Sequence, residues 1–491
     1  MTALRTAPPP PLAAASPIPW GRTAVALLAA LVLVKLAGLF LDPALRFFMG
    51  DSGSYLHTAL TGWLPPDRSF TYGLLVGHGV LPIGSSLALL VLQALFGIAT
   101  AMALAQVLFR SCAVHPLLAA GAALALAIEP AQLFYERMLM AESAGTLAFV
   151  LCVAALVVYA RNGRHRWMAL AAAMGILAIS LRLSLLPVVL GLTATVPVVV
   201  ALHHAPRGGR IMALARHLGF ALVVTTALHA AYQASYRRDY GEATYLPANG
   251  MMRIGLVAPL VRAEHFQGTG VDGGKVLAEL GQPLADSRRR EAQVWATDGL
   301  YQTLSRHTDR PEAVARVVTG RALRDSPLGW VRLGLDNVRG YFDPGVRAFR
   351  LQDDLGRRPP DEGMLATVQA RLGYDARGVA ASSSPATRWF ELGAPWLIAG
   401  FLLLAPLAVL GLALHWRSPA RAAVIVLCLA SLGLVSSHLL FAHIASLRYL
   451  HPMPWFVLAN LALVLETLRR RYLTDRTPPD RPAASVRGVH G

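Results

Sequence analysis

Long apolar runs alternate with short polar segments along most of this chain. Ten runs approach the ~20 mostly apolar residues that a helix needs to cross a bilayer, and each is predicted to span the membrane. They lie at 23–41, 84–109, 114–128, 138–160, 167–181, 184–203, 212–232, 389–414, 420–440 and 449–467. The predicted fold class is therefore an all-α polytopic membrane protein with about ten transmembrane helices.

The apolar run at 71–82 is ambiguous by length, and the charges of the later loops decide its placement. If it does not cross, the arginine-rich loops all fall on the side of the N-terminus, which the positive-inside rule makes the cytoplasm. These loops carry Arg161, Arg164, Arg166, Arg207, Arg210, Arg417, Arg421, Arg469, Arg470 and Arg471. The run is predicted to be a juxtamembrane helix on the outer leaflet, and both chain ends are predicted to be cytoplasmic.

The spans divide the chain into five predicted parts. They are a disordered cytoplasmic tail at 1–22, an N-terminal transmembrane module at 23–232 with its first outer loop at 42–83, an extracytoplasmic helical insertion at 233–388, C-terminal transmembrane helices at 389–468 and a disordered cytoplasmic tail at 469–491. Within the insertion, Pro311 and Pro327 predict the first turns of two helices. The second of these, with Trp330 and Leu333 on an apolar stripe, is predicted to lie on the membrane surface.

Composition excludes an ordinary soluble globule, because 55% of the residues are hydrophobic, only 15% are charged and the mean hydropathy is +0.48. The net charge of +17 lies mostly in short loops, so no nucleic-acid partner is predicted. Cys112, Cys152 and Cys428 lie in or beside apolar runs at wide spacing, which indicates neither a disulfide framework nor a cysteine metal site.

The first outer loop contains a segment with two faces, GDSGSYLHTALTGW. At helical spacing its apolar stripe consists of Leu56, Ala59, Leu60 and Trp63. Its polar face consists of Asp51, Ser54, Tyr55 and Thr58. Such a helix can rest on the bilayer with its polar edge toward the protein. Asp51 is then either part of a site or simply the N-cap of the helix.

Glu142 lies inside the apolar run at 138–160, near its outer end. An ionisable residue there costs about 2 to 3 kcal/mol unless it faces a cavity or a partner. We interpret Glu142 as a site residue, and the alternative is a structural pair with Arg137 or Arg182. Lys35, within the first span, is interpreted as snorkelling to the interface.

Two arginines recur at the depth of Glu142. Arg182 marks a turn in AISLRLSLLP, and Arg448 opens LRYLHPMPWF before the last span. Each can snorkel on its own, but together in one outer cavity they would bind an anionic head group. Glu129 and Glu136 are interpreted as solvated rim charges.

A resident metal is not predicted. His438, His443 and His451 cluster around the last two spans, but their spacing matches no familiar zinc pattern. The sequence also contains no Walker-type phosphate-binding loop and no HExxH or GxSxG element.

The order of these motifs resembles the GT-C superfamily of membrane glycosyltransferases, in particular bacterial relatives of dolichyl-phosphate-mannose protein mannosyltransferases. The similarity covers about the first 200 residues and the last 50. The matching motifs are GDSGSYLHTAL with Asp51 and Tyr55, DRSFTYG with Arg68, LMAESAGTL with Glu142, LRLSLLP with Arg182, and LRYLHPMPWF with Arg448 and Tyr449.

Three features depart from the family pattern. The double acidic motif of the first loop is reduced to Asp51, the proline after the basic residue is replaced in RSFTYG, and the long insertion at 233–388 lies between spans. These departures bear on the substrate more than on the chemistry.

The resemblance implies inverting transfer of a sugar from a polyprenyl-phosphate donor to a cell-envelope glycan, lipid or protein, at the extracytoplasmic face of a bacterial inner membrane. It implies Asp51 as the general base. Glu142 would orient the acceptor, position an arginine or hold a divalent cation with Asp51; no other cofactor is expected. The substrate-binding residues it implies are Tyr55, Arg68, Arg182, Arg448 and Tyr449.

Two other functions stay open. A lipid or polysaccharide flippase or transporter predicts charges at the membrane midplane and paired halves, whereas here the ionisable residues gather at the outer ends of the spans and no internal repeat is visible. An oligosaccharide polymerase or ligase would use the same kind of donor and outer arginines, but would move whole glycans.

Overall fold

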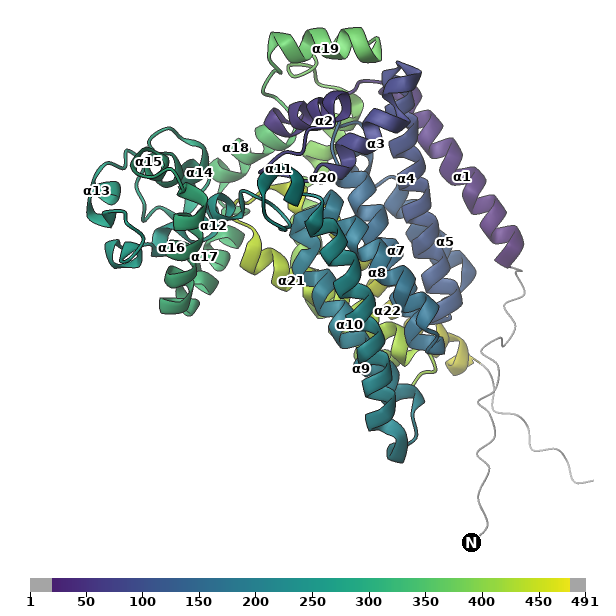
Figure 1. The fold of residues 1–491 in the computed structure, drawn as a ribbon. Helices are drawn as coiled ribbons and strands as arrows, with labels where there is room; N and C mark the ends of the chain where they lie inside the picture. The colour runs from purple at the N-terminus through teal and green to yellow at the C-terminus, as the bar shows by residue number, and fades with distance from the viewer. Residues whose placement is uncertain (1–19, 477–491) are drawn as a thin grey trace, which may run out of the picture.

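The structure, a computed structural model, describes residues 20–476 and forms no named strand within that range. A bundle of long helices makes up most of the molecule, and a smaller helical lobe lies to one side of it (Figure 1). The bundle contains α1 (Trp20–Leu41), α4 (Ser86–Gln106), α5 (Pro116–Ala127), α6 (Pro130–Tyr135), α7 (Glu142–Asn162), α8 (His165–Leu181), α9 (Leu186–His204), α10 (Arg210–Ala234), α20 (Pro385–His415), α21 (Arg421–Phe441) and α22 (Met453–Arg476).

The prediction of an all-α polytopic membrane protein is confirmed. Every apolar run predicted to span contains a helix, and seven helices in the described range are long and apolar enough to cross a membrane. The other three predicted spans correspond to α5, α8 and α22. With 12 residues, α5 is only about 18 Å long, because the chain breaks at Ile128 and Glu129 and restarts as α6 at Pro130.

Two short helices, α2 (Met49–Thr61) and α3 (Thr71–Gly79), cap one end of the bundle (Figure 1). At nine residues α3 is too short to span, as predicted for 71–82. The two helices cross closely, since a Cβ on Gly77 would lie 2.7 Å from the Ala59 carbonyl oxygen. Part of the apolar stripe of α2 therefore packs on α3 rather than on the bilayer: Leu56 is buried and Ala59 lies at the crossing.

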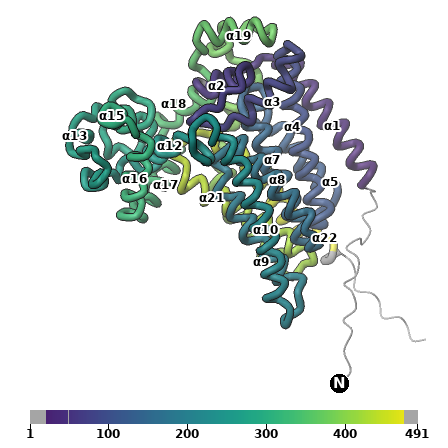
Figure 2. The backbone as a smooth tube through the Cα atoms, viewed as in Figure 1, coloured from purple at the N-terminus to yellow at the C-terminus, as the bar shows by residue number. Residues whose placement is uncertain are grey.

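The side lobe stands beside the bundle in the backbone trace of Figure 2. It has a hydrophobic core of its own, formed by buried residues between Ala248 and Ala322. Its helices are α12 (Asn249–Val257), α13 (Gly273–Ala278), α14 (Ala292–Trp295), α15 (Leu300–His307), α16 (Pro311–Asp325) and α17 (Pro327–Gly340). Both predicted proline-initiated helices form. The predicted apolar stripe of α17 packs on α21: Leu333 is buried and the Trp330 ring lies 5.4 Å from the Phe441 ring. The position of α17 at the membrane surface stays a prediction.

Two further helices, α18 (Pro344–Asp354) and α19 (Glu362–Leu372), lead from the lobe back to the α2 end of the bundle (Figure 1). The insertion thus contributes side chains near α2. At the C-terminus, α22 continues past the predicted boundary at 468 to Arg476, because Arg469 and Arg470 pair with Glu466 one turn earlier. Most of the two predicted tails, 1–19 and 477–491, lies outside the described residues.

Two interpretations of buried charges were wrong. The side chains of Lys35 and Glu136 form a 2.7 Å ion pair, and each is only 3% exposed. Lys35 therefore does not snorkel to the interface, and Glu136 is not a solvated rim charge. Lys35 also donates to the carbonyl of Ala127, the last residue of α5. The negative end of that helix and the Glu136 carboxylate together offset the cost of burying the ammonium group.

Candidate active site

Five charged side chains singled out in the sequence meet at the α2 end of the bundle. Asp51 comes from the first turn of α2 and Arg68 from the turn before α3. Glu142 begins α7, Arg182 directly follows α8, and Arg448 lies in a short 3₁₀ turn before α22. Tyr55 lies in α2, one turn after Asp51, and Tyr449 follows Arg448 in the same 3₁₀ turn.

A buried serine fixes the position of α2 against the start of α7. The Ser52 hydroxyl donates to the Leu139 carbonyl at 2.9 Å and accepts from the Phe48 amide at 2.8 Å. The N-cap of α2 is Phe48, so the alternative in which Asp51 serves as the N-cap is wrong. Asp51 instead projects from the helix toward the charged cluster.

The Asp51 carboxylate is held between two arginines. Its Oδ1 lies 2.5 Å from Arg68 Nη1, and its Oδ2 lies 2.6 Å from Arg448 Nη1. Burial disfavours the charged carboxyl, but Arg448 and Arg68 outweigh that effect and hold its pKa below the ordinary value. Asp51 is therefore ionised at neutral pH, and a quarter of its side chain is exposed.

Glu142 joins the other two guanidinium groups. Its Oε1 lies 3.6 Å from Arg448 Nε and 3.9 Å from Arg182 Nη1. The carboxylate is 4% exposed and lies in the first turn of α7, where the helix dipole favours negative charge. The anticipated pairing with Arg182 exists and is shared with Arg448. Arg137 has a different partner, Asp42.

Arg182 fits against α7 because of a glycine. A Cβ on Gly145 would lie 2.8 Å from both Cγ and Cδ of Arg182, so any larger residue would displace the arginine. Arg182 Nη2 donates to the Arg448 carbonyl at 3.3 Å. Arg182 Nη1 and Arg448 Nε, although buried, have no hydrogen-bond acceptor. Two cationic N–H groups are thus left with unused donor capacity inside the site.

Aromatic rings hold the Arg448 guanidinium in place. Its central carbon lies 4.4 Å from the centroid of the Phe48 ring and 5.4 Å from that of Tyr449. With 14% of its side chain exposed and ion pairs to Asp51 and Glu142, Arg448 is an interior charge rather than a snorkelling one.

Tyr55 is buried beside the cluster, with its ring 5.0 Å from that of Tyr72. Burial, together with the negative charges of Asp51 and Glu142, raises the pKa of its hydroxyl. Tyr55 therefore stays neutral and keeps a proton to donate in a hydrogen bond at physiological pH.

The cluster is balanced in charge. Asp67 also belongs to it, through a 2.6 Å bond from Arg68 Nη2 to its Oδ2. Three carboxylates, Asp51, Asp67 and Glu142, then match three guanidinium groups, Arg68, Arg182 and Arg448. An incoming anion must therefore share arginines that carboxylates already occupy.

The histidines around the last spans have other partners. His438 Nε2 lies 3.1 Å from the Tyr341 hydroxyl, and His451 Nδ1 lies 3.2 Å from the Thr146 hydroxyl. Within residues 20–476, no group of three histidine, cysteine, aspartate or glutamate side chains is arranged to hold a metal ion.

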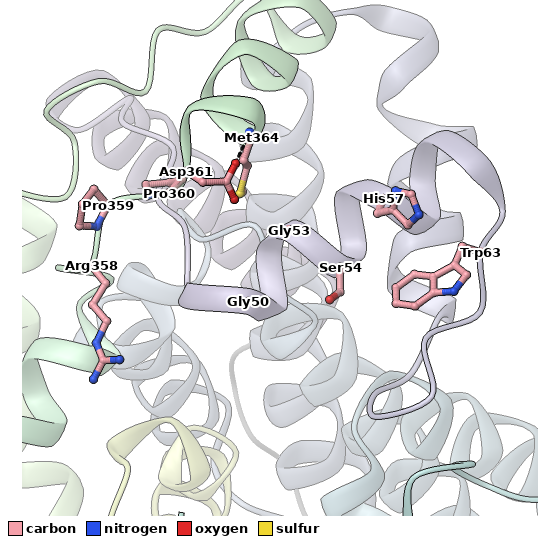
Figure 3. A pocket seen from close by; sticks show the side chains of 10 residues that line it. All are labelled: Gly50, Gly53, Ser54, His57, Trp63, Arg358, Pro359, Pro360, Asp361 and Met364. Atoms are coloured by element: carbon pink, nitrogen blue, oxygen red, sulfur yellow. Dashed lines mark hydrogen bonds between the residues drawn. The ribbon is translucent and has the colours of Figure 1, made fainter. Parts of the chain in front are cut away.

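A cavity of about 570 Å³ opens beside α2 (Figure 3). The helix presents Gly50, Gly53, Ser54 and His57 to it, Trp63 lies at one end, and the opposite wall consists of Arg358, Pro359, Pro360, Asp361 and Met364. Ser54 lies about 60° around the helix from Asp51, so the cavity adjoins the face that carries the carboxylate. The 358–364 wall belongs to the insertion and has no motif by which the sequence could have identified it.

Comparisons with known proteins give one weak likeness. No protein-family model matches the chain, and no curated protein matches it. Among solved structures, it is similar to the crystal structure of ArnT from Cupriavidus metallidurans bound to undecaprenyl phosphate, at 15% identity over 93% of this chain and 81% of that one, with a TM-score of 0.36. At that level the function has to be argued from the site itself.

Proposed function

We propose that this protein is a membrane glycosyltransferase that moves a sugar from a polyprenyl-phosphate donor to an acceptor hydroxyl, with inversion at the sugar carbon. One observation carries the proposal: the Asp51 carboxylate faces Arg68 and Arg448 in the same buried cluster that contains Arg182 and Glu142. A base and fixed positive charge thus lie side by side at one end of a membrane helix bundle.

Asp51 is the proposed general base. An acceptor hydroxyl is a poor nucleophile, and a carboxylate that takes its proton as the new bond forms can contribute ~10²- to 10⁴-fold. The two arginines weaken Asp51 as a base, because they lower its pKa. A donor phosphate that draws one guanidinium away would raise this pKa again, so the base gains strength when the donor is bound.

The arginines are the proposed phosphate ligands. The leaving group is a lipid phosphate that is stable as an anion, so the reaction needs fixed positive charge rather than a general acid. Arg182 Nη1 and Arg448 Nε are buried N–H groups without acceptors, which supports their use as donors to phosphate oxygens. Glu142 contacts both guanidinium groups, and of its three predicted roles the geometry favours positioning them.

The bonds and charges balance without a further reactant. The acceptor oxygen bonds to the sugar carbon on the side opposite the phosphate, and the bond from that carbon to the phosphate oxygen breaks. The bonding electrons leave with the polyprenyl phosphate, and the hydroxyl proton passes to Asp51. Attack from the opposite side inverts the configuration of the sugar carbon.

The cavity beside α2 is the proposed approach for the acceptor. Asp51 lies next to Gly50, and Ser54 occupies the neighbouring face of the helix. The charged groups of the wall already have partners, since Arg358 bonds Asp353 at 3.0 Å and Asp361 caps α19. A cavity with paired charges and an exposed Trp63 ring suits a hydroxyl-bearing glycan, lipid or protein segment.

The site is proposed to face the extracytoplasmic side of a bacterial inner membrane. The loop between α9 and α10 and the end of α22 lie at the opposite end of the bundle from α2 (Figure 1). These segments carry Arg207, Arg210 and the 469–471 arginines. By the positive-inside rule their end is cytoplasmic, which supports an extracytoplasmic Asp51.

Substitution of the base tests the proposal. In proteoliposomes supplied with polyprenyl-phosphate sugars, Asp51→Asn should lower sugar transfer by roughly 10²-fold or more, with expression and lipid-phosphate binding retained. Asp272→Asn, which removes an exposed carboxylate of the side lobe, is the matched control and should keep full activity. A fully active Asp51→Asn enzyme would remove the proposed base, and lipid movement without sugar consumption would favour a flippase.

A further inference from the structure

A buried carboxylate of the insertion lies beside the charged cluster. Asp354, the last residue of α18, is only 1% exposed. Its Oδ1 accepts from the Ser446 hydroxyl at 2.5 Å, and its Oδ2 accepts from the Leu447 amide at 2.7 Å. Arg448 is the next residue, so Asp354 holds the backbone from which this arginine projects.

Other contacts hold the same short segment. The Tyr341 hydroxyl, also from the insertion, donates to the Ser446 carbonyl at 2.8 Å. On the far side, the Arg448 carbonyl accepts from Arg182 at 3.3 Å. The segment is thus tied to the insertion before Arg448 and to the bundle after it. Among these contacts only the Asp354 carboxylate supplies two acceptors.

We propose that Asp354 is a positioning residue: its ionised carboxylate holds Ser446 and Leu447 so that Arg448 is placed to bind the phosphate of the lipid donor. The inference rests on the proposed function for the identity of the anion. The structural claim is separate from that identity. Arg448 should bind an anion less tightly when Asp354 no longer holds its backbone, although Asp354 itself does not touch the anion.

Protonation should weaken the hold. A protonated Oδ1 can donate to the Ser446 hydroxyl oxygen while Oδ2 still accepts from the Leu447 N–H. Both bonds then lose the charge of the carboxylate, and hydrogen bonds to an ionised acceptor are roughly twice as strong as neutral ones. Burial raises the pKa of Asp354 to about 6, against the opposing effects of Ser446, Arg448, Leu447 and Arg350. The hold is therefore strongest at neutral pH and weakens as the pH falls below about 6.

The groups that interact electrostatically with Asp354 are arginines and tyrosines. The groups in electrostatic contact with it are Arg448, Arg350, Tyr135 and Tyr341. Arginine and tyrosine ordinarily titrate at about pH 10 or higher. A change in anion affinity around pH 6 that disappears with Asp354 would accordingly report on this carboxyl.

Binding of a singly charged lipid phosphate tests the inference. The probe is the methyl ester of undecaprenyl phosphate. This diester keeps a single negative charge between about pH 5 and pH 7, whereas undecaprenyl phosphate itself would gain a second charge at about pH 6. With the full chain in lipid nanodiscs at neutral pH, Asp354→Ala, which removes both acceptors, should bind the probe roughly tenfold more weakly than Asp354→Asn, which has the same charge but can still contact Ser446 and Leu447. At about pH 5 wild type and Asp354→Asn should bind it alike, because the wild-type carboxyl is then protonated.

Two further variants make the result specific. Asp353→Asn changes the neighbouring carboxylate, which pairs with Arg350 and Arg358, and should keep the wild-type affinity and pH profile. Ser446→Ala removes one of the two bonds and should weaken binding by a smaller factor. It also tests the hold if Asp354→Ala does not fold.

The outcomes separate the inference from the proposed function. Equal affinities of Asp354→Ala and Asp354→Asn at neutral pH, or a difference between Asp354→Asn and wild type that persists at about pH 5, would overturn the positioning role. Failure of the wild-type protein to bind the probe at either pH would instead count against the lipid-phosphate donor itself.

Discussion

At the scale of single residues, the site combines charges that oppose one another. Arg68 and Arg448 keep Asp51 ionised but also make it a weak base. Under the proposed function, a donor phosphate would compete with Asp51 for the same guanidinium groups. Donor binding would then raise the strength of the base through the arginines.

Gly145→Ala should weaken donor use while leaving every charged residue in place. The added methyl group would lie 2.8 Å from Cγ and Cδ of Arg182 and would shift its guanidinium. We expect a rise of roughly tenfold in KM for the polyprenyl-phosphate sugar, measured by steady-state transfer. Gly121→Ala, at a position where nothing lies within 4 Å, is the control. An unchanged KM in Gly145→Ala would contradict this packing.

Sequence reasoning found these residues unevenly. Asp51, Glu142, Arg182 and Arg448 stand out because a charge at the end of an apolar run is a local and costly feature. Partners far away in the chain leave no such signal. The pairing of Lys35 with Glu136 joins positions 101 residues apart, so both residues were assigned to the solvent or the interface.

At the scale of elements, the helices were predictable because about 20 apolar residues in a row are a property of the chain itself. The short α5 agrees with its predicted run at 114–128 to within two residues at either end, but the buried Lys35 ammonium that binds at its last residue, Ala127, was not visible. The contribution of α18 and α19 to the site was not visible either. Asp354 acts on a segment 92 residues later, which only the tertiary fold brings within reach.

The crossing of α2 and α3 gives a prediction at this scale. Gly77→Ala would place a Cβ 2.7 Å from the Ala59 carbonyl and push apart the two helices that position Asp51 and Arg68. We expect a loss of about 1 to 3 kcal/mol in stability, seen as a lower thermal unfolding temperature in detergent, together with lower transfer activity. Gly79→Ala, at the exposed end of the same helix with nothing within 4 Å, should be neutral. Equal unfolding temperatures for the two variants would show that the crossing is looser.

At the scale of the whole molecule, the proposed chemistry depends on the side of the membrane that the α2 end faces. The three cysteines are buried, so background labelling by a thiol reagent should be low. Ala370→Cys on α19 marks the α2 end, and Gly208→Cys marks the exposed loop between α9 and α10 (Figure 1). Both positions lie outside the charged cluster and the cavity lining.

In intact cells, a membrane-impermeant maleimide should label Ala370→Cys, and it should label Gly208→Cys only after the inner membrane is permeabilised. The reason is the positive-inside rule, which predicts that the arginine-bearing α9–α10 end lies in the cytoplasm. Labelling in the reverse order would put Asp51 on the cytoplasmic side. An acceptor in the cell envelope could not reach the base there, so the same chemistry would have to act on a cytoplasmic acceptor.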